Sequence, residues 1–268
     1  MADLTRPIFL LTDFGTRDAY AGQVKGVIAG IAPHSPIIDL THDVEPFAID
    51  EGAWLLETSM SALPPAAVVV AVVDPGVGTA RRGLLVLCEG RAFIGPDNGL
   101  LSCAFPPDLR DGRGGASPDV RELTDPRFHR ATVSATFHAR DIFGPVAAHI
   151  ATGLDHRLVG PPAATPVLLP PCCGQLPALG ELRGEVVHID RFGNLITTIR
   201  AAQLFPAFEL QIGGRAIARQ VRTFADAPPG EPFCHVDSSG YIAIAVNQGN
   251  AAATLGVTRR DPVVVRAR

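Results

Sequence analysis

Three side chains in the sequence could act together in acid–base chemistry: Asp74, Arg81 and His138. Asp74 directly follows the apolar run 66–73, Arg81 lies further along the same loop, and His138 stands just before an expected helix. A carboxylate can accept a proton, an arginine supplies a permanent charge, and a histidine exchanges protons near neutral pH. Each residue alone also has a structural explanation, as a turn residue, a solvated arginine or a helix-capping histidine. Their joint role depends on the elements that position them.

Other polar residues gather directly after strand-like segments. These segments read Thr12-Asp13-Phe14-Gly15, Thr41-His42-Asp43, Asp74-Pro75-Gly76-Val77-Gly78 and Gly95-Pro96-Asp97-Asn98-Gly99. Because ligands of parallel α/β sheets bind outside the carboxyl ends of the strands, we expect a site at these loops. Gly76-Val77-Gly78 is not a dinucleotide-binding fingerprint, since Arg81 occupies the position of the third glycine.

The first half of the chain alternates strand-like and helix-like segments, which predicts an α/β domain with a mostly parallel central sheet. Strands are expected at 8–12, 37–40 and 66–73, and a hairpin at 84–94 around Glu89-Gly90. Helices are expected at 20–31, 49–60 and 139–151, the last ended by Gly153. The run 66–73 is unbroken and β-branched, which is typical of a strand buried on both faces.

The alternation of strand-like and helix-like segments ends near residue 160, where a proline-rich stretch begins. After this stretch, short β-type runs follow one another with little helix, and Gly213-Gly214 marks a hairpin turn. The predicted organisation is an α/β N-terminal domain at 1–160, a linker at 161–178, and a smaller all-β barrel domain at 179–268.

Composition excludes several classes of protein. The 268 residues are 47% hydrophobic and 19% charged with a net charge of −4, which excludes a disordered chain and argues against a nucleic-acid binder. Lys25 is the only lysine and does not stand in a P-loop motif, so lysine-dependent chemistry is not expected. The five cysteines form no C-x-x-C pair, and no metal site is expected. No signal peptide or membrane span is evident, and the expected location is the cytoplasm.

At these loops the sequence resembles the S-adenosylmethionine hydroxide adenosyltransferase family, whose superfamily includes the fluorinase and chlorinase enzymes. The longest matching stretches are Val73-Asp74-Pro75-Gly76-Val77-Gly78-Thr79 with Arg81-Arg82, and Thr136-Phe137-His138-Ala139-Arg140-Asp141-Ile142-Phe143-Gly144-Pro145. Shorter matches include Leu11-Thr12-Asp13-Phe14-Gly15, Thr41-His42, Pro96-Asp97-Asn98-Gly99-Leu100 and Phe192-Gly193-Asn194. They run through nearly the whole chain in family order.

The resemblance implies that the chain hydrolyses S-adenosylmethionine to adenosine and L-methionine without a cofactor or metal. It also implies a sheet-based N-terminal domain, a β-barrel C-terminal domain and a homotrimer. In that trimer each active site lies between the N-terminal domain of one subunit and the C-terminal domain of the next.

The resemblance further implies a catalytic role for Asp74, Arg81 and His138, which take the positions of the family's polar triad. In the halide enzymes the positions of Asp74 and His138 are tyrosines, and Ala139 corresponds to a halide-contacting serine or glycine. These differences favour water as the nucleophile. The hypothesis is that Arg81 and His138 hold the water while Asp74 fixes the charge balance, with either Asp74 or His138 as the final base.

Substrate-binding residues carry over from the family in the same way. Asp13 is expected to accept hydrogen bonds from the ribose hydroxyls, beside Phe47, and Asp18 to face the methionine ammonium. Asn194 is expected to read the adenine edge and Ser238 to contact the methionine carboxylate. The expected binding set is completed by Phe137, Asp190 and Phe192.

Two other functions remain open from the sequence. A non-catalytic protein that binds adenosine or S-adenosylmethionine could keep Asp13 and Asn194 without needing the full triad. A halide adenosyltransferase that makes 5′-halo-5′-deoxyadenosine is disfavoured, because the carboxylate of Asp74 repels an anion.

Overall fold

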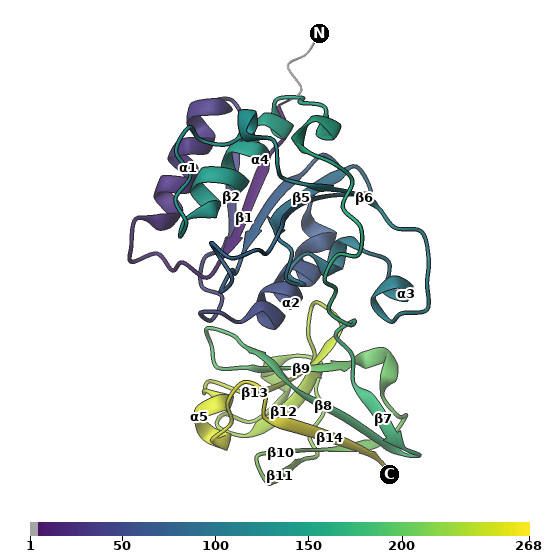
Figure 1. Ribbon diagram of the computed structural model, residues 1–268. Helices are drawn as coiled ribbons and strands as arrows, with labels where there is room; N and C mark the ends of the chain where they lie inside the picture. Colours follow the sequence, from purple (N-terminus) through teal and green to yellow (C-terminus); the bar gives the residue numbers. More distant parts are fainter. Residues whose placement is uncertain (1–4) are drawn as a thin grey trace. The chain divides into compact units, whose positions relative to one another are not determined.

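The computed structural model describes residues 5–268, which divide into two compact units with their boundary between Pro171 and Cys172 (Figure 1). The two units differ in secondary structure. Helices pack on a sheet in the first unit, whereas the second unit consists mainly of strands. Among the helices of the described residues, none combines the length and the hydrophobicity that a membrane span requires.

The sheet of the first unit has six strands in the order β2-β1-β3-β5-β4-β6. Their bounds are β1 Ile8–Thr12, β2 Ile37–Thr41, β3 Val68–Val72, β4 Gly83–Cys88, β5 Arg91–Pro96 and β6 Asp119–Glu122. Strand β1 pairs in parallel with β2 and β3, and β3 with β5, whereas β4 runs antiparallel to both of its neighbours. The sheet is therefore mixed rather than simply parallel.

Strand β4 runs antiparallel to its neighbours because a tight hairpin joins it to β5. Glu89 and Gly90 both have positive φ, at 51° and 80°, which suits the two-residue turn of a tight hairpin. A two-residue turn can join only antiparallel strands, since a parallel pair needs a long crossover.

Helices cover both faces of the sheet. On one face α1 (Tyr20–Ile31) packs against α4 (Gly144–Ala151), and on the other lies α2 (Ile49–Ser59) (Figure 1). Strand β3 is buried along its whole length, with Val68, Val70 and Val72 facing one core and Val69 and Ala71 facing the other. This alternation follows from the two-residue period of a strand. A short helix, α3, spans Pro107–Arg110.

The proline-rich stretch is anchored to the first unit as far as residue 171. Arg82 donates hydrogen bonds to the carbonyl oxygens of Ala164 and Thr165, at 2.9 and 3.1 Å. The backbone N–H of Val167 donates to Asp97 Oδ1 at 2.8 Å, and that of Leu169 to the Ser102 hydroxyl at 2.7 Å. Residues 161–171, expected as part of a linker, thus pack as a segment of the first unit.

The second unit is an antiparallel sheet in the order β11-β10-β14-β8-β9-β13-β12, with β7 also paired to β8. Its elements are β7 Gln175–Ala178, β8 Glu181–Ile189, β9 Leu195–Arg200, β10 Phe208–Ile212, β11 Arg215–Ile217, β12 Pro232–Val236, β13 Tyr241–Val246, α5 Ala251–Leu255 and β14 Pro262–Ala267. An isolated bridge between Gln220 and Cys234 brings the segment after β11 to β12. The sheet is therefore a nearly closed barrel around a main apolar core, and a smaller apolar cluster includes Phe233 and Ala245.

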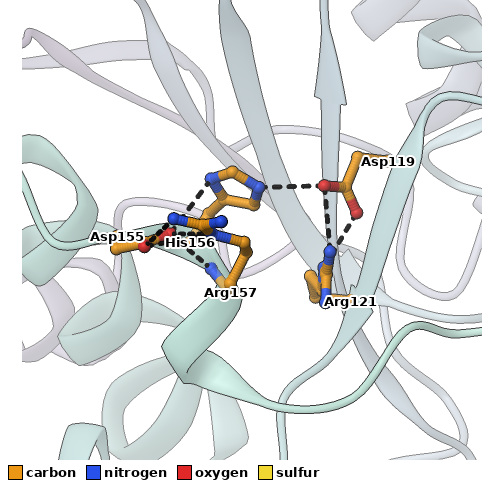
Figure 2. Close-up of polar contacts among 5 residues, drawn as sticks. All are labelled: Asp119, Arg121, Asp155, His156 and Arg157. Carbon is orange, nitrogen blue, oxygen red and sulfur yellow. Dashed lines mark hydrogen bonds and ion pairs between the residues drawn. The ribbon is translucent and has the colours of Figure 1, made fainter.

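A polar cluster holds the edge strand β6 of the first unit (Figure 2). Asp119 on β6 accepts hydrogen bonds from Arg121 Nε at 2.8 Å and lies 2.9 Å from His156 Nε2. Asp155 caps the short helix His156–Val159 by accepting from the backbone N–H of Arg157 at 3.0 Å. The cluster ties the segment after α4 to the sheet edge, and its five residues do not line the pocket described next.

Candidate active site

A pocket of about 270 Å³ lies where the loops after β1, β2 and β3 meet the segment before α4. This is the edge of the sheet at which parallel α/β folds bind ligands. All of its lining residues belong to the first unit: Asp13, Phe14, Tyr20, Pro46, Phe47, Val72, Asp74, Val77, Thr136, Phe137, His138 and Ala139. Five residues expected from the sequence are thereby brought together: Asp13, Phe47, Asp74, Phe137 and His138.

Arg81 joins Asp74 to His138. Its Nε donates to Asp74 Oδ1 and Oδ2 at 2.9 and 3.1 Å, and its Nη2 donates to Asp74 Oδ2. The same Nη2 lies 2.9 Å from His138 Nδ1. The side chains of Arg81 and Asp74 are only 11% and 6% exposed, so this ion pair is shielded from water. Asp74 and His138 line the pocket, and Arg81 lies behind them with its guanidinium 5.1 Å from the Phe143 ring centre.

The contact with Arg81 fixes the protonation state of His138. A guanidinium has only donors, so Nδ1 of His138 must accept, and the neutral ring then carries its hydrogen on Nε2. Burial lowers the pKa of His138, and the charge of Arg81 lowers it further, against the opposing effects of Asp74 and Asp141. The imidazole is therefore neutral at neutral pH.

Asp13 and Phe47 shape another side of the pocket. The backbone N–H of Phe47 donates to Asp13 Oδ2 at 3.0 Å, and Phe47 adopts a positive φ of 69° with a side chain left 71% exposed. Such a backbone conformation is uncommon and energetically costly for a bulky residue such as phenylalanine. Burial raises the pKa of Asp13, the Phe47 N–H opposes this, and the charge of Asp74 adds a smaller increase.

Three aromatic rings form a wall that the sequence did not reveal as a group. Phe137 packs against Phe14 and Tyr20 with ring centres 5.9 and 5.4 Å apart, and Phe14 lies 6.1 Å from Tyr20. Phe14 belongs to a motif that the sequence analysis singled out, and Tyr20 starts α1. Nothing in their spacing indicates contact, because the three come from different elements.

In the second unit, Asp190, Phe192 and Asn194 share one tight turn between β8 and β9. Asp190 Oδ1 accepts from the backbone N–H groups of Phe192 and Asn194, both at 2.9 Å, and its Oδ2 accepts from Asn194 Nδ2 at 2.7 Å. The Phe192 side chain is 74% exposed, whereas Asn194 is buried. Asp190 thus orients the amide of Asn194 and supports the turn that carries Phe192.

Ser238 lies at the far end of the same strand pair. Strands β9 and β13 are antiparallel, with Leu195 opposite Ile244 and Arg200 opposite Tyr241. Asn194 directly precedes Leu195 at one end of this strand pair, and Ser238 lies beyond Tyr241 at the other end. At the usual rise per residue of a strand, Asn194 and Ser238 are therefore about 20 Å apart along the ladder. In the first unit Asp18 is exposed in the loop before α1 and does not line the pocket.

Among the described residues, no group of three or more His, Cys, Asp or Glu side chains is arranged to hold a metal ion.

Family models match both units of the chain. The model described as SAM hydroxide adenosyltransferase N-terminal domain matches residues 8–160, and the model for the C-terminal domain of the same family matches residues 184–264. Together they cover most of the sequence and every residue discussed as part of the candidate site.

Individual relatives agree with these models. The "(R)-S-adenosyl-L-methionine hydrolase" of Thermus thermophilus is 40% identical, over 96% of this chain and 98% of its own length. A fluorinase from Actinopolyspora mzabensis is more distant, at 26% identity over 92% of this chain and 93% of its own. The crystal structure of an uncharacterized conserved protein from Thermotoga maritima superposes with a TM-score of 0.85 at 33% identity, covering 97% of this chain and 100% of that chain.

Proposed function

The chain belongs to the SAM hydroxide adenosyltransferase family, and from this premise we propose that it hydrolyses S-adenosylmethionine to adenosine and L-methionine. The observation that carries the proposal is the arrangement of Asp74 and His138 on the wall of one pocket, bridged by a shielded Arg81. The name of the hydrolase from Thermus thermophilus supports the same reaction.

The reaction breaks the bond between C5′ of the ribose and the sulfonium sulfur. A water oxygen bonds to C5′ on the side opposite the sulfur, the electrons of the broken bond pass to sulfur, and methionine leaves as a neutral thioether. No acid is needed for such a leaving group. One proton is released for each substrate consumed.

We propose that Asp74 accepts this proton and that His138 orients the water. Nδ1 of His138 already accepts a hydrogen bond from Arg81, which makes the ring a poor base while that contact lasts. The carboxylate oxygens of Asp74 have lone pairs beyond those used by Arg81. As the bond to carbon forms, the water becomes strongly acidic, so even a carboxylate is basic enough to remove its proton.

Water suits this site better than a halide ion. A chloride or fluoride next to the carboxylate of Asp74 would be repelled, whereas a neutral water can donate a hydrogen bond to it. The fluorinase relative is also the more distant of the two relatives compared.

We propose the following contacts for the rest of the substrate. Asp13 binds the ribose hydroxyls beside Phe47 and Phe137, and Asn194 reads the adenine edge. Asp18 and Ser238 bind the methionine ammonium and carboxylate. Adenine and the carboxylate are the two ends of an elongated molecule, which agrees with the wide separation of Asn194 and Ser238 on the β9–β13 ladder.

We also propose a homotrimer in which the turn at 190–194 and the loop at Ser238 of a neighbouring copy complete the pocket. The exposed rings of Phe47 and Phe192, at 71% and 74%, support this proposal, because exposed aromatic side chains at a binding site gain from being covered.

The substrate we propose is the epimer with R configuration at the sulfonium sulfur, because the name of the Thermus thermophilus relative specifies it. Removing one epimer would leave the other available as a methyl donor.

The direct test incubates the purified chain separately with each sulfonium epimer, with and without chloride, and separates the products by chromatography. Equal amounts of adenosine and methionine from the R epimer, unaffected by chloride, are expected. A halonucleoside in the chloride arm would overturn the choice of water. Bound adenosine without methionine release would instead identify a binding protein.

A further inference from the structure

We propose that Asp141 is a positioning residue that holds Phe137 and His138 in the geometry the reaction needs. This inference rests on the proposed hydrolysis, but it concerns a side chain outside the pocket. Asp141 is fully buried, and its carboxylate is the point at which the loop before α4 is tied together.

The carboxylate of Asp141 contacts three points of its own loop. Arg130 Nη1 donates to Oδ1 at 3.1 Å, and the backbone N–H of Ser134 donates to Oδ2 at 2.8 Å. Arg140 forms a two-pronged contact, with Nε to Oδ1 at 2.7 Å and Nη2 to Oδ2 at 2.9 Å. The segment closed by these bonds, residues 130–141, carries the pocket residues Thr136, Phe137 and His138.

Arg140 passes this constraint to the pocket wall. Its guanidinium lies 4.7 Å from the centre of the Phe137 ring, and its Nη1 donates to Gln23 Oε1 on α1 at 3.1 Å. Because Nε and Nη2 of Arg140 both bind the carboxylate of Asp141, the orientation of the guanidinium plane beside the Phe137 ring is fixed. Phe137 in turn packs against the ring of Tyr20 in the same aromatic wall of the pocket.

The backbone at this point is also unusual. Residues Ala139–Phe143 form a π-helical turn that begins directly after His138, and Asp141 lies inside it. Such turns are rare and occur frequently at functional sites. The turn connects His138 directly to α4, and the Asp141 network anchors it.

Packing alone does not account for Asp141. A buried ion pair is often no more stabilising than apolar residues of similar volume, so a fully buried carboxylate with two arginines is weak as a stability device. A satisfied polar network does, however, specify one geometry. His138 is faced by charges from several elements: Arg81, Asp74, Asp141 and His129. Loss of the negative charge at Asp141 favours neutral His138.

The test compares Asp141→Asn with the matched control Glu57→Gln. Glu57 forms a partly buried ion pair with Arg110 at 2.9 Å, away from the pocket. For Asp141→Asn, kcat is expected to fall about 100-fold, the scale of a small misplacement of reacting groups. The acid limb of the pH–rate profile should move to lower pH. Glu57→Gln should leave kcat and the acid limb unchanged, and Asp141→Glu should recover part of the lost rate.

Two further measurements keep the outcome decisive. If Asp141→Asn does not fold, Arg140→Gln removes the support under Phe137 and is expected to lower kcat. The acid limb should not move to lower pH in this variant, because the negative charge of Asp141 is retained. An NMR titration of His138 needs no turnover, so it tests positioning even if the chain fails to hydrolyse S-adenosylmethionine. Folded variants with the wild-type kcat and an unmoved His138 titration would overturn the proposal, as would a loss of rate equal to that of Glu57→Gln.

Discussion

At the scale of single residues, Arg81 determines how its two neighbours behave. It is one of many arginines in a chain with a single lysine, and its position in the motif that begins at Asp74 distinguishes it from the others. Its forked donors reach both oxygens of Asp74 and one nitrogen of His138. A single side chain thus holds the carboxylate in place and favours the neutral imidazole, with its hydrogen directed away from Arg81.

Arg81→Lys is expected to lower kcat by about 100- to 1,000-fold, because an ammonium group cannot bridge Asp74 and His138 in the same fixed fork. Steady-state kinetics with S-adenosylmethionine measure the change. Arg91→Lys is the control, since Arg91 pairs with Glu89 on a hairpin outside the pocket. Similar rates for both variants would show that the charge of Arg81 suffices and that its geometry is unimportant.

The pH dependence of the reaction is expected to follow His138. Its pKa is lowered by burial and by Arg81, so the rate should persist as pH falls through the ordinary histidine value of about 6.5 and drop only at more acidic pH. Protonation of Nδ1 then breaks the contact with Arg81. NMR titration should also give a higher His138 pKa in Arg81→Gln, and an unchanged or lower value would contradict this assignment.

The residues of the site were predictable to different degrees. Asp74, Arg81 and His138 were identified because their motifs are long and specific, and the structure brings all three together. The wall of Phe14, Tyr20 and Phe137 was not identified, since ring contacts between separate elements leave no periodic signal. The roles assigned to Asp18 and Ser238 stay predictions.

At the scale of elements, the catalytic loops depend on one close approach. Gly78 has a φ of 77°, and a Cβ at this position would lie 2.3 Å from the carbonyl oxygen of Ala135. The loop that carries Asp74 and Arg81 therefore meets the loop that carries His138 at a point where only glycine fits.

Gly78→Ala is expected to lower the free energy of unfolding by about 1–3 kcal/mol, because of both the positive φ and the collision with Ala135. Urea denaturation measures this change, and kcat should fall in parallel as the two loops separate. The control is Gly22→Ala on α1, where an added Cβ meets no atom within 4 Å. That variant should gain roughly 0.5–1 kcal/mol, and a loss of stability in the control alone would contradict the account.

Local patterns predicted most elements but not their pairing. The helical spacing of apolar residues predicted a helix over 20–31, and the unbroken apolar run at 66–73 predicted a buried strand. The structure contains both, as α1 and β3. Strand β6 was missed, because it is short and carries several charged residues. The attachment of 161–171 could not be predicted, since it depends on the distant side chains of Arg82 and Asp97 binding backbone atoms.

At the scale of the whole molecule, the proposed trimer makes a prediction that a monomer cannot satisfy. Asp74→Asn removes the proposed proton acceptor from the first unit. Asn194→Ala removes the proposed adenine contact from the second unit, so each variant alone should be inactive. In an equal mixture assembled by refolding or coexpression, about a quarter of sites in a ring of subunits combine two undamaged halves.

Recovery of about a quarter of the wild-type rate in the mixture is therefore expected. Gel filtration of the same samples checks that assembly occurs. If every site is built from one chain, each carries a damaged half and the mixture stays inactive, which would contradict the shared site.

In the proposed reaction, water attacks C5′ of S-adenosylmethionine in the pocket of Asp74 and His138. Hydrolysis in ¹⁸O-labelled water, followed by mass spectrometry of the nucleoside, tests it most directly. We expect adenosine that carries one heavy oxygen at its 5′ position, and much slower formation of this product by Asp74→Asn than by the wild-type chain. Unlabelled adenosine, or a nucleoside that keeps its sulfur, would contradict it.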